Sequence, residues 1–356
     1  MDHKQEDPDR LSVVAWIRSG WKGIVPIGVA AAVALVIGGG VDFAHSYGDP
    51  RDREEERSAK PAADQDRAAP RYVVGVRGSG EALVVRDVRT GRDVGLPVAA
   101  PKDKRFQRVA SADDGSFVVA VDPEGGAARA TGQAARVTFQ RLRLGKDGGV
   151  EELVPLTRAA IPGASAPWSD LAVAPDGDSI AYVTYRPGAR PRLDVVSART
   201  GQRKTWASKT PGRVGSLSWS GSTLSFVWSP TRKVGGKTVR QFRTLDTSTA
   251  APGNLQASKA LFKLPEGSAG TAVMNRDGRT VVLGLAQGGQ LSLQAYALPA
   301  GRPGKVLWKR KAAGGTVSRL DADHTGDHLL ISTQDGTLYP EGADPVPAKD
   351  LLDATW

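Results

Sequence analysis

The sequence contains no cysteine, two methionines and four histidines among 356 residues. The lack of cysteine excludes a disulfide framework, a thiol nucleophile and any metal site built on thiolates. It does not identify a compartment, because an oxidising exterior leaves a protein without thiols unaffected. Two of the histidines, His3 and His45, precede the region where strand patterns begin, which leaves His324 and His328 there. Histidine-based catalysis therefore has few candidate residues.

Motifs for nucleophilic or carboxylate catalysis are also missing. Gly163–Pro167 contains a serine but lacks the second glycine and the following helix of a nucleophile elbow, so it predicts a connector. Glu151 and Glu152 are adjacent and point to opposite faces of a strand, which does not suit a pair of facing carboxylates. Gly78–Gly80 predicts a hairpin turn and not a phosphate-binding loop, because no helix follows it. We expect no catalytic residues of these kinds and no cofactor.

One long run does lack charge. Residues 23–41 are nineteen residues without Asp, Glu, Lys or Arg, and as a helix they span about 28 Å, close to the thickness of a bilayer's hydrocarbon core. Trp16 and Trp21 lie on one flank, where interfacial aromatics are enriched. The run predicts a single transmembrane helix, and the alternative is a signal peptide cleaved near Gly38 or Gly40.

The charges next to this run predict its orientation. Arg18 and Lys22 adjoin it on the N-terminal side, whereas Asp42 follows it and the first base beyond is Arg51. Residues 1–22 are therefore predicted to be a cytoplasmic tail. Residues 42–70 are polar and charged, which predicts a disordered stalk. Residues 71–356 are then predicted to lie outside the plasma membrane.

Basic charge is concentrated beyond the stalk. The net charge is −3 for residues 1–70 and +13 for residues 71–356, and residues 195–245 and 278–320 contain no acid. Such a surface attracts phosphate-rich lipids, anionic wall polymers or nucleic acid, or it is a soluble basic face without a partner. Its place outside the cell argues against nucleic acid. The predicted basic and aromatic binding face consists of Arg203, Lys204, Trp206, Lys209, Arg213, Arg232, Lys233, Lys237 and Arg240.

A repeated unit dominates residues 71–356. Residues 171–206 read as four short strands, at 171–174, 180–185, 193–196 and 202–206, which together make one blade of a β-propeller. A turn ending in glycine, followed by an apolar run, occurs at Gly115, Gly177, Gly221, Gly278 and Gly326.

The first unit is incomplete. Residues 72–76, 83–88 and 93–96 resemble the second to fourth strands of a blade that has no first strand. Residues 351–356 are predicted to return and supply that inner strand, which removes exposed edges. The fold class predicted is therefore all-β, a six-bladed propeller. The alternative is five blades, if the C-terminal unit merges with the N-terminal strands.

The unit at Ala174–Val183, with Pro175-Asp176-Gly177 at its turn, resembles the repeat of TolB-type, WD40-like β-propellers. Asp114-Gly115 and Asp277-Gly278 keep only the Asp-Gly pair. The resemblance implies a propeller that acts as a binding platform in the bacterial cell envelope. Some relatives add a peptidase domain, which is not present in this sequence.

Two further groups are candidate sites. Asp321, Asp323 and Asp327 begin like a calcium-binding loop, but Ser332 stands where a bidentate glutamate is expected, so a plain turn is the alternative. Four tryptophans are candidates for stacking on a ligand or for packing between blades: Trp206, Trp219, Trp228 and Trp308.

The sequence thus predicts a membrane-tethered, extracytoplasmic binding or scaffold module for a protein or an anionic envelope polymer. The alternative is a hydrolase or lyase that uses carboxylates at the mouth of the propeller's central channel.

Overall fold

The computed structural model describes residues 69–123, 135–232, 238–266, 268–311, 315–323 and 325–356. The predicted tail (1–22), transmembrane helix (23–41) and most of the predicted stalk (42–70) lie outside these residues. The chain divides into two units, 1–35 and 36–356, and every described residue belongs to the second. Within the described residues, no helix has the length and apolar character needed to cross a membrane.

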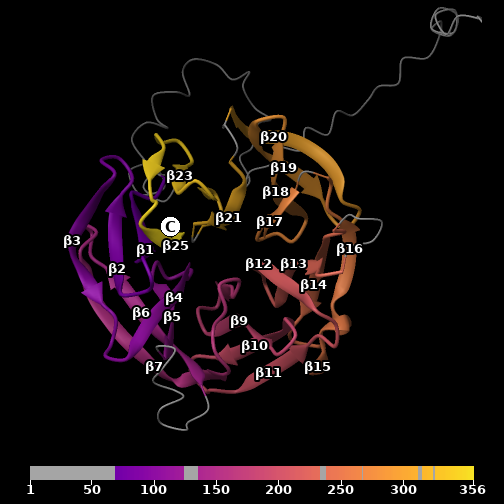
Figure 1. The fold of residues 1–356 in the computed structure, drawn as a ribbon, viewed down its shortest axis with the longest axis horizontal. Coiled ribbons are helices and arrows are strands. Elements are labelled where there is room, and N and C mark those ends of the chain that lie inside the picture. Colours follow the sequence, from indigo (N-terminus) through magenta and orange to yellow (C-terminus); the bar gives the residue numbers. More distant parts are fainter. Residues whose placement is uncertain (1–68, 124–134, 233–237, 267, 312–314, 324) are drawn as a thin grey trace, which may run out of the picture. The chain divides into compact units, whose positions relative to one another are not determined.

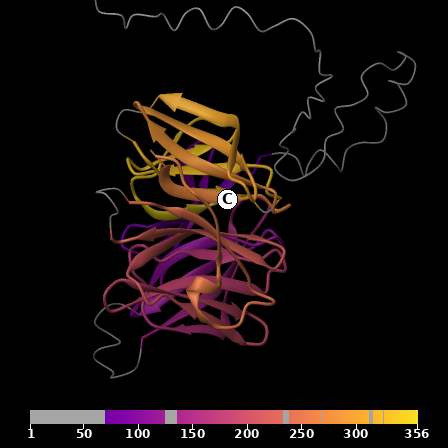
Figure 2. The same cartoon turned by 90° about the vertical axis from the view of Figure 1, so that its right-hand side faces the viewer.

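Six sheets, each with four antiparallel strands, are arranged as blades around a centre (Figure 1), and the side view shows the blades packed against one another (Figure 2). Blade 1 contains β1 (Tyr72–Arg77), β2 (Ala82–Asp87), β3 (Arg92–Ala99) and β25 (Leu351–Thr355). Blade 2 contains β4 (Lys104–Ser111), β5 (Phe117–Pro123), β6 (Arg136–Leu144) and β7 (Val150–Pro162). Blade 3 contains β8 (Leu171–Val173), β9 (Ser179–Arg186), β10 (Arg190–Ser197) and β11 (Arg203–Ala207), with β15 (Gly253–Asn254) paired parallel to β11.

The remaining blades follow the same order. Blade 4 contains β12 (Gly212–Ser220), β13 (Thr223–Pro230), β14 (Gln241–Asp246) and β16 (Lys259–Lys263). Blade 5 contains β17 (Ser268–Met274), β18 (Thr280–Gln287), β19 (Gln290–Ala297) and β20 (Arg302–Lys311). Blade 6 contains β21 (Val317–Ala322), β22 (Leu329–Thr333), β23 (Thr337–Pro340) and β24 (Val346–Pro347). The prediction of six blades is confirmed, and the five-bladed alternative is wrong.

The repeated turns form because their residue types satisfy the backbone locally. In the turn between β8 and β9, Gly177 has φ of 65°, a left-handed conformation that glycine adopts without steric cost. The Asp176 carboxylate accepts hydrogen bonds from the backbone N–H groups of Asp178 and Ser179, at 2.8 and 3.0 Å. Each turn of this kind ends one inner strand and starts the buried second strand of a blade.

The core lies between the blades. The described core residues form six clusters, and each cluster combines side chains of two neighbouring blades, including blades 6 and 1. A sheet packed on both faces needs apolar residues on both, which explains the continuous buried apolar run Ala82–Val85 of β2.

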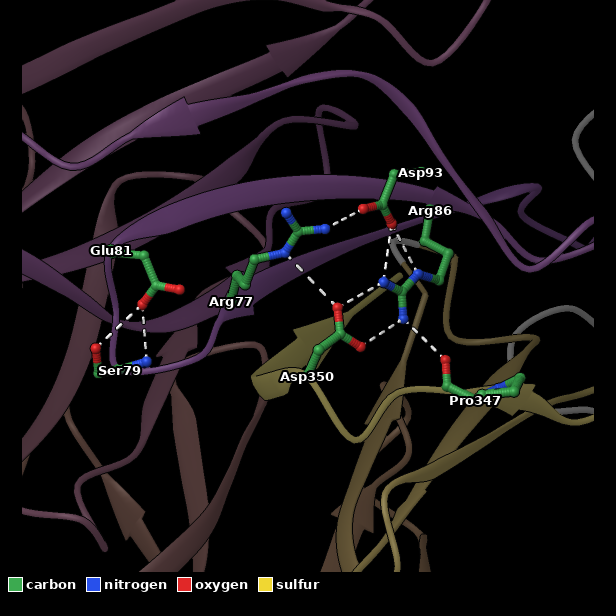
Figure 3. Close-up of polar contacts among 7 residues, drawn as sticks. All are labelled: Arg77, Ser79, Glu81, Arg86, Asp93, Pro347 and Asp350. Atoms are coloured by element: carbon green, nitrogen blue, oxygen red, sulfur yellow. Dashed lines mark hydrogen bonds and ion pairs between the residues drawn. The ribbon is translucent and has the colours of Figure 1, made fainter.

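The ring is closed by β25, as the sequence predicts. This strand pairs antiparallel with β1, and Val74 lies opposite Thr355. Beside the strand, Arg86 of β2 makes ion pairs of 2.8 Å with both Asp93 and Asp350 and donates to the Pro347 carbonyl (Figure 3). The hydrogen bond to Asp350 raises the pKa of Arg86 against the opposing effect of burial. Arg86 therefore ties the N-terminal strands to the segment that leads into β25.

Candidate binding site at the centre of the ring

A central cavity of about 700 Å³ lies where the inner strands begin. Its size is in the range of small-molecule sites. Four arginines and three aspartates are among the side chains that line it: Arg108, Arg213, Arg240, Arg319, Asp170, Asp321 and Asp353. The wall also contains ten serine and threonine residues, so it offers many uncharged hydrogen-bonding groups.

The buried wall of the cavity contains an ion pair. Arg319 of β21 pairs with Asp353 of β25, and it also donates to the Val109 carbonyl of β4 at 3.0 Å. Asp353 accepts from the Val109 N–H at 2.9 Å. Burial by itself lowers the pKa of Arg319, but the carboxylates of Asp353 and Asp321 outweigh burial and raise it. This charged pair therefore connects the inner strands of blades 6, 1 and 2.

The other two aspartates are also bonded to inner strands. Asp170 accepts from the Leu171 N–H and from the Leu217 N–H of β12, both at 2.9 Å. Asp321 accepts from the Thr355 hydroxyl, and burial raises the pKa of this carboxyl. All three carboxyl groups of the cavity thus have hydrogen-bond donors from the protein itself.

The mouth of the cavity contains an aromatic residue held in a fixed position. Trp168 belongs to the connector between β7 and β8, and 38% of it is exposed. The Arg213 guanidinium lies 4.8 Å from the centre of its ring, and Tyr185 meets it edge-on at 5.6 Å. Arg108 donates to the carbonyls of Pro167 and Ser169 on either side of it. Four contacts therefore immobilise this connector.

Arg240 lies on the opposite side of blade 4 from this connector. It donates to the Ser268 carbonyl at 2.9 Å, and its side chain passes over Gly270. A Cβ at Gly270 would lie 3.1 Å from the Arg240 Cδ, so a side chain there would displace the arginine. The glycine thus leaves room for a second guanidinium at the cavity.

The far end of the ring centre is narrower. A second cavity there has a volume of about 90 Å³. Arg276, in the turn after β17, makes a bidentate ion pair of 2.5 and 2.7 Å with Asp113, in the turn after β4. Because blades 2 and 5 are three positions apart in a ring of six, this pair crosses the centre. Access to the large cavity is therefore from the Trp168 side.

The structure does not gather the predicted basic and aromatic face into one surface. Arg213 and Arg240 line the central cavity, whereas Arg203 and Lys204 lie on the outer strand β11. Arg203 is 3.5 Å from Asp194, and Lys204 donates to two carbonyls of the segment after β14. Trp206 is fully buried and donates to the Ala251 carbonyl at 2.9 Å, so its indole is unavailable for stacking.

The other members of that face are scattered. Lys209 lines a separate outer groove together with Arg186 and Arg190. Arg232 is exposed and does not line the central cavity, and Lys233 and Lys237 lie outside the described residues.

The calcium-like loop is a hairpin turn between β21 and β22. Asp323 accepts from the Thr325 hydroxyl at 2.8 Å and from the His328 N–H at 3.1 Å, and the Asp327 N–H donates to Thr325 at 3.2 Å. Asp321 points to Thr355 instead. In the part of the chain that the structure describes, no three Asp, Glu, His or Cys side chains are grouped closely enough to hold a metal ion. The turn interpretation fits these contacts.

Ser165 is a residue of the connector before β8, as its motif predicts. Its backbone N–H donates to Asp122 at 3.0 Å, and its hydroxyl lies 2.6 Å from the Tyr182 hydroxyl. Burial raises the pKa of Asp122 to about 6. Ser165 thus fixes the start of the connector to blades 2 and 3.

Sequence reasoning missed Trp168. Of the four tryptophans proposed for stacking, Trp206 and Trp219 are buried, and Trp228 and Trp308 are partly buried against core clusters. Trp168 differs because it stands in a Pro- and Ser-containing connector instead of a strand. That position is the signal that could have identified it, since connector residues are not needed for packing between blades.

Neither a protein-family model nor a curated protein matches the chain. Solved structures resemble its fold. TolB from Acinetobacter baumannii is 15% identical, with 80% of this chain and 65% of that chain covered and a TM-score of 0.45. A putative TolB from Agrobacterium tumefaciens is 14% identical, covering 80% and 88%, with a TM-score of 0.44. The periplasmic gluconolactonase PpgL of Pseudomonas aeruginosa is 16% identical, covering 77% and 81%, with a TM-score of 0.46.

The chain spans slightly less than two thirds of the Acinetobacter protein, and at these identities the named activities belong to those proteins alone. The strand order of this chain itself establishes the closed ring of six sheets, and its own sequence contains the Pro175-Asp176-Gly177 turn. The protein is an all-β, six-bladed propeller.

Proposed function

We propose that this propeller is a binding module whose arginine-rich cavity mouth holds an anionic ligand, either an acidic segment of a protein or an anionic envelope polymer. The observation that carries the proposal is that the acidic and the basic side chains of the cavity differ in how far the protein itself satisfies them. All three aspartates accept hydrogen bonds from inner strands, whereas Arg213 and Arg240 make no ion pair with a carboxylate among the described residues. Guanidinium groups bind carboxylates and phosphates through paired hydrogen bonds.

The net charge supports the same proposal. Residues 71–356 have a net charge of +13, which steers anions toward the propeller at low ionic strength. The residues at the mouth then supply the short-range contacts. The pinned connector with Trp168 means that little reorganisation is needed when a ligand arrives.

Binding of polyglutamate or polyphosphate by the full chain tests this function. Replacing both Arg213 and Arg240 by glutamine is expected to weaken binding at least about tenfold, because each loses a charge-assisted contact. The matched control is Arg302→Gln with Lys305→Gln on the exposed outer strand β20, which removes the same charge outside the cavity. Calorimetric titration at low and moderate salt measures both. Equal losses in the two double variants would mean that net charge alone attracts the anion and would refute a site.

The alternative function is a hydrolase or lyase that uses Asp170, Asp321 and Asp353. The presence of three carboxyl groups in one cavity favours it. Their hydrogen bonds to inner strands favour the binding function instead, because a general base or nucleophile needs a lone pair directed at the substrate. Turnover of a bound anionic polymer, lost in Asp170→Asn, would favour the enzyme.

The tether is part of the proposal. Residues 23–41 would anchor the chain once in the plasma membrane, with residues 1–22 in the cytoplasm and the propeller outside. The nineteen uncharged residues and the flanking Arg18 and Lys22 support this arrangement.

Membrane extraction and protease protection test the tether. The full chain is expected to stay with membranes in alkaline carbonate and to be digested from outside in intact spheroplasts. Ala32→Arg with Leu35→Arg is expected to release it, because each charge costs about 2.5–3.5 kcal/mol at the centre of a membrane helix. An N-terminus found just after residue 38 or 40 would instead identify a cleaved signal peptide.

A further inference from the structure

We infer that the cavity mouth between blades 3 and 5 is a subsite for an acidic sugar, with the sugar ring on Trp168 and its carboxylate or phosphate between Arg213 and Arg240. We call this group, with Ser229, the rim subsite. The inference rests on the proposed function and narrows its ligand to one chemical class.

The aromatic part of the subsite is formed before any ligand binds. Trp168 has Arg213 on one face of its ring and Tyr185 at its edge, and 38% of the residue stays exposed. The Tyr185 hydroxyl is itself fixed, because it accepts from the Val214 N–H at 3.2 Å. Binding to a rigid aromatic surface costs little conformational entropy, and the apolar face of a sugar ring suits such a surface.

The strand register places the two arginines on one row. Arg213 of β12 lies opposite Ser229 of β13, and Trp228 lies opposite Gln241 of β14. Ser229 is therefore next to Arg240 along the same register. Neighbouring strands are about 4.8 Å apart, so the two arginine backbones are about 10 Å apart with the serine between them. The two guanidinium groups lie on opposite sides of blade 4, one over Trp168 and the other beside Gly270. An anionic group in front of Ser229, at the inner end of blade 4, would therefore lie between them.

The backbone beside the subsite is irregular in a way that favours binding. Strand β12 has a bulge between Gly215 and Ser218, and β17 has one between Ser268 and Ala272. Within the first bulge, Ser216 has φ of 56°, which is strained for a residue other than glycine. Bulges redirect side chains and are frequent next to binding sites.

The lining favours a sugar over other anions. Ten serines and threonines surround the cavity, which suits a ring with several hydroxyl groups. A simple inorganic anion would use the arginines but neither the tryptophan nor the hydroxyl-rich wall. The ligand is anionic because the guanidinium groups at the mouth lack carboxylate partners among the described residues.

The test compares ligands that differ in one property. The full chain is titrated with a glucuronate trisaccharide, its neutral methyl ester, glucose 6-phosphate, glucose, acetate and inorganic phosphate. We expect the acidic sugar, with carboxylate or phosphate, to bind at least tenfold more tightly than both its neutral counterpart and the anion alone. Glucuronate and glucose 6-phosphate are then compared with each other, and the tighter of these two single-ring ligands identifies the anionic group.

A substitution separates this inference from the proposed function. Trp168→Leu is expected to weaken the acidic sugar at least tenfold and polyglutamate much less, because a peptide has no sugar ring to place on the indole. The surface variant Arg302→Gln is expected to change neither by more than twofold. If Trp168→Leu weakens polyglutamate and the sugar equally, or if the anions alone bind as tightly as the sugars, the sugar subsite is refuted and anion binding stands. If neither polyglutamate nor any sugar binds, both proposals are refuted.

Discussion

Replacing Trp356 by alanine is expected to lower the free energy of unfolding by about 3–5 kcal/mol, the usual cost of truncating a large buried aromatic residue. Trp356 follows β25, is 3% exposed and packs with Val73 of blade 1 and Leu338 and Val346 of blade 6. It therefore fills the seam where the first and last blades meet. Urea unfolding, extrapolated to water, measures the change.

The matched control is Leu352→Ala in β25 itself. Leu352 is 43% exposed, so its loss is expected to cost less than about 1 kcal/mol. The two variants remove apolar side chains within four positions of each other. If the two variants destabilise the protein equally, Trp356 does not stabilise the contact between blades 6 and 1 more than an exposed leucine does. The stabilising role assigned to Trp356 would then be wrong.

The closing strand was predictable because the first blade lacks one strand in the N-terminal sequence and the C-terminal sequence has one strand to spare. Three strands at residues 72–96 lack an inner partner, and residues 351–356 are a mostly apolar segment without a blade of their own. A sheet edge left open is unfavourable, so joining the two is the simplest solution. The pairing of Val74 with Thr355 is what that reasoning requires.

The short pairings at the blade edges were not predictable in the same way. The excursion between β14 and β16 adds β15 to the edge of blade 3, and β24 is only two residues long. Both segments are too short to show alternating apolar residues: β15 is Gly253–Asn254, and β24 contributes a single buried side chain, Val346. Periodicity carries no information about such contacts.

The central cavity was still harder to predict from the sequence, because part of its lining comes from segments that connect the strands. The charge pattern along the sequence correctly drew attention to Arg213 and Arg240, but the same pattern included Arg203, which reaches Asp194 from a different strand. A stretch of sequence without acidic residues can still lie next to acidic residues from other strands in the folded protein. Trp168 is held at the mouth in part by Arg108, sixty residues earlier, which donates to the carbonyls on either side of it.

Replacing Asp353 by alanine is the second change with a large expected effect, about 3–5 kcal/mol, because it leaves the Arg319 guanidinium buried without its ion-pair partner. Asp353 also loses its bond to the Val109 N–H, so three inner strands lose a shared contact. The cost should be recovered in part by Arg319→Leu with Asp353→Leu, because that pair removes both charges from the interior.

The control is a similar pair on the surface. Arg143 and Glu152 lie 3.9 Å apart with about half of each side chain exposed, so Glu152→Ala is expected to change the free energy of unfolding by at most about 0.5 kcal/mol. Urea unfolding of the four proteins, at one pH and salt concentration, compares them directly. A loss below about 1 kcal/mol in Asp353→Ala would show that water reaches Arg319 and screens it. The cavity would then extend deeper than its lining indicates, and the aspartate would be available to a ligand instead of being committed to holding blades 6, 1 and 2 together.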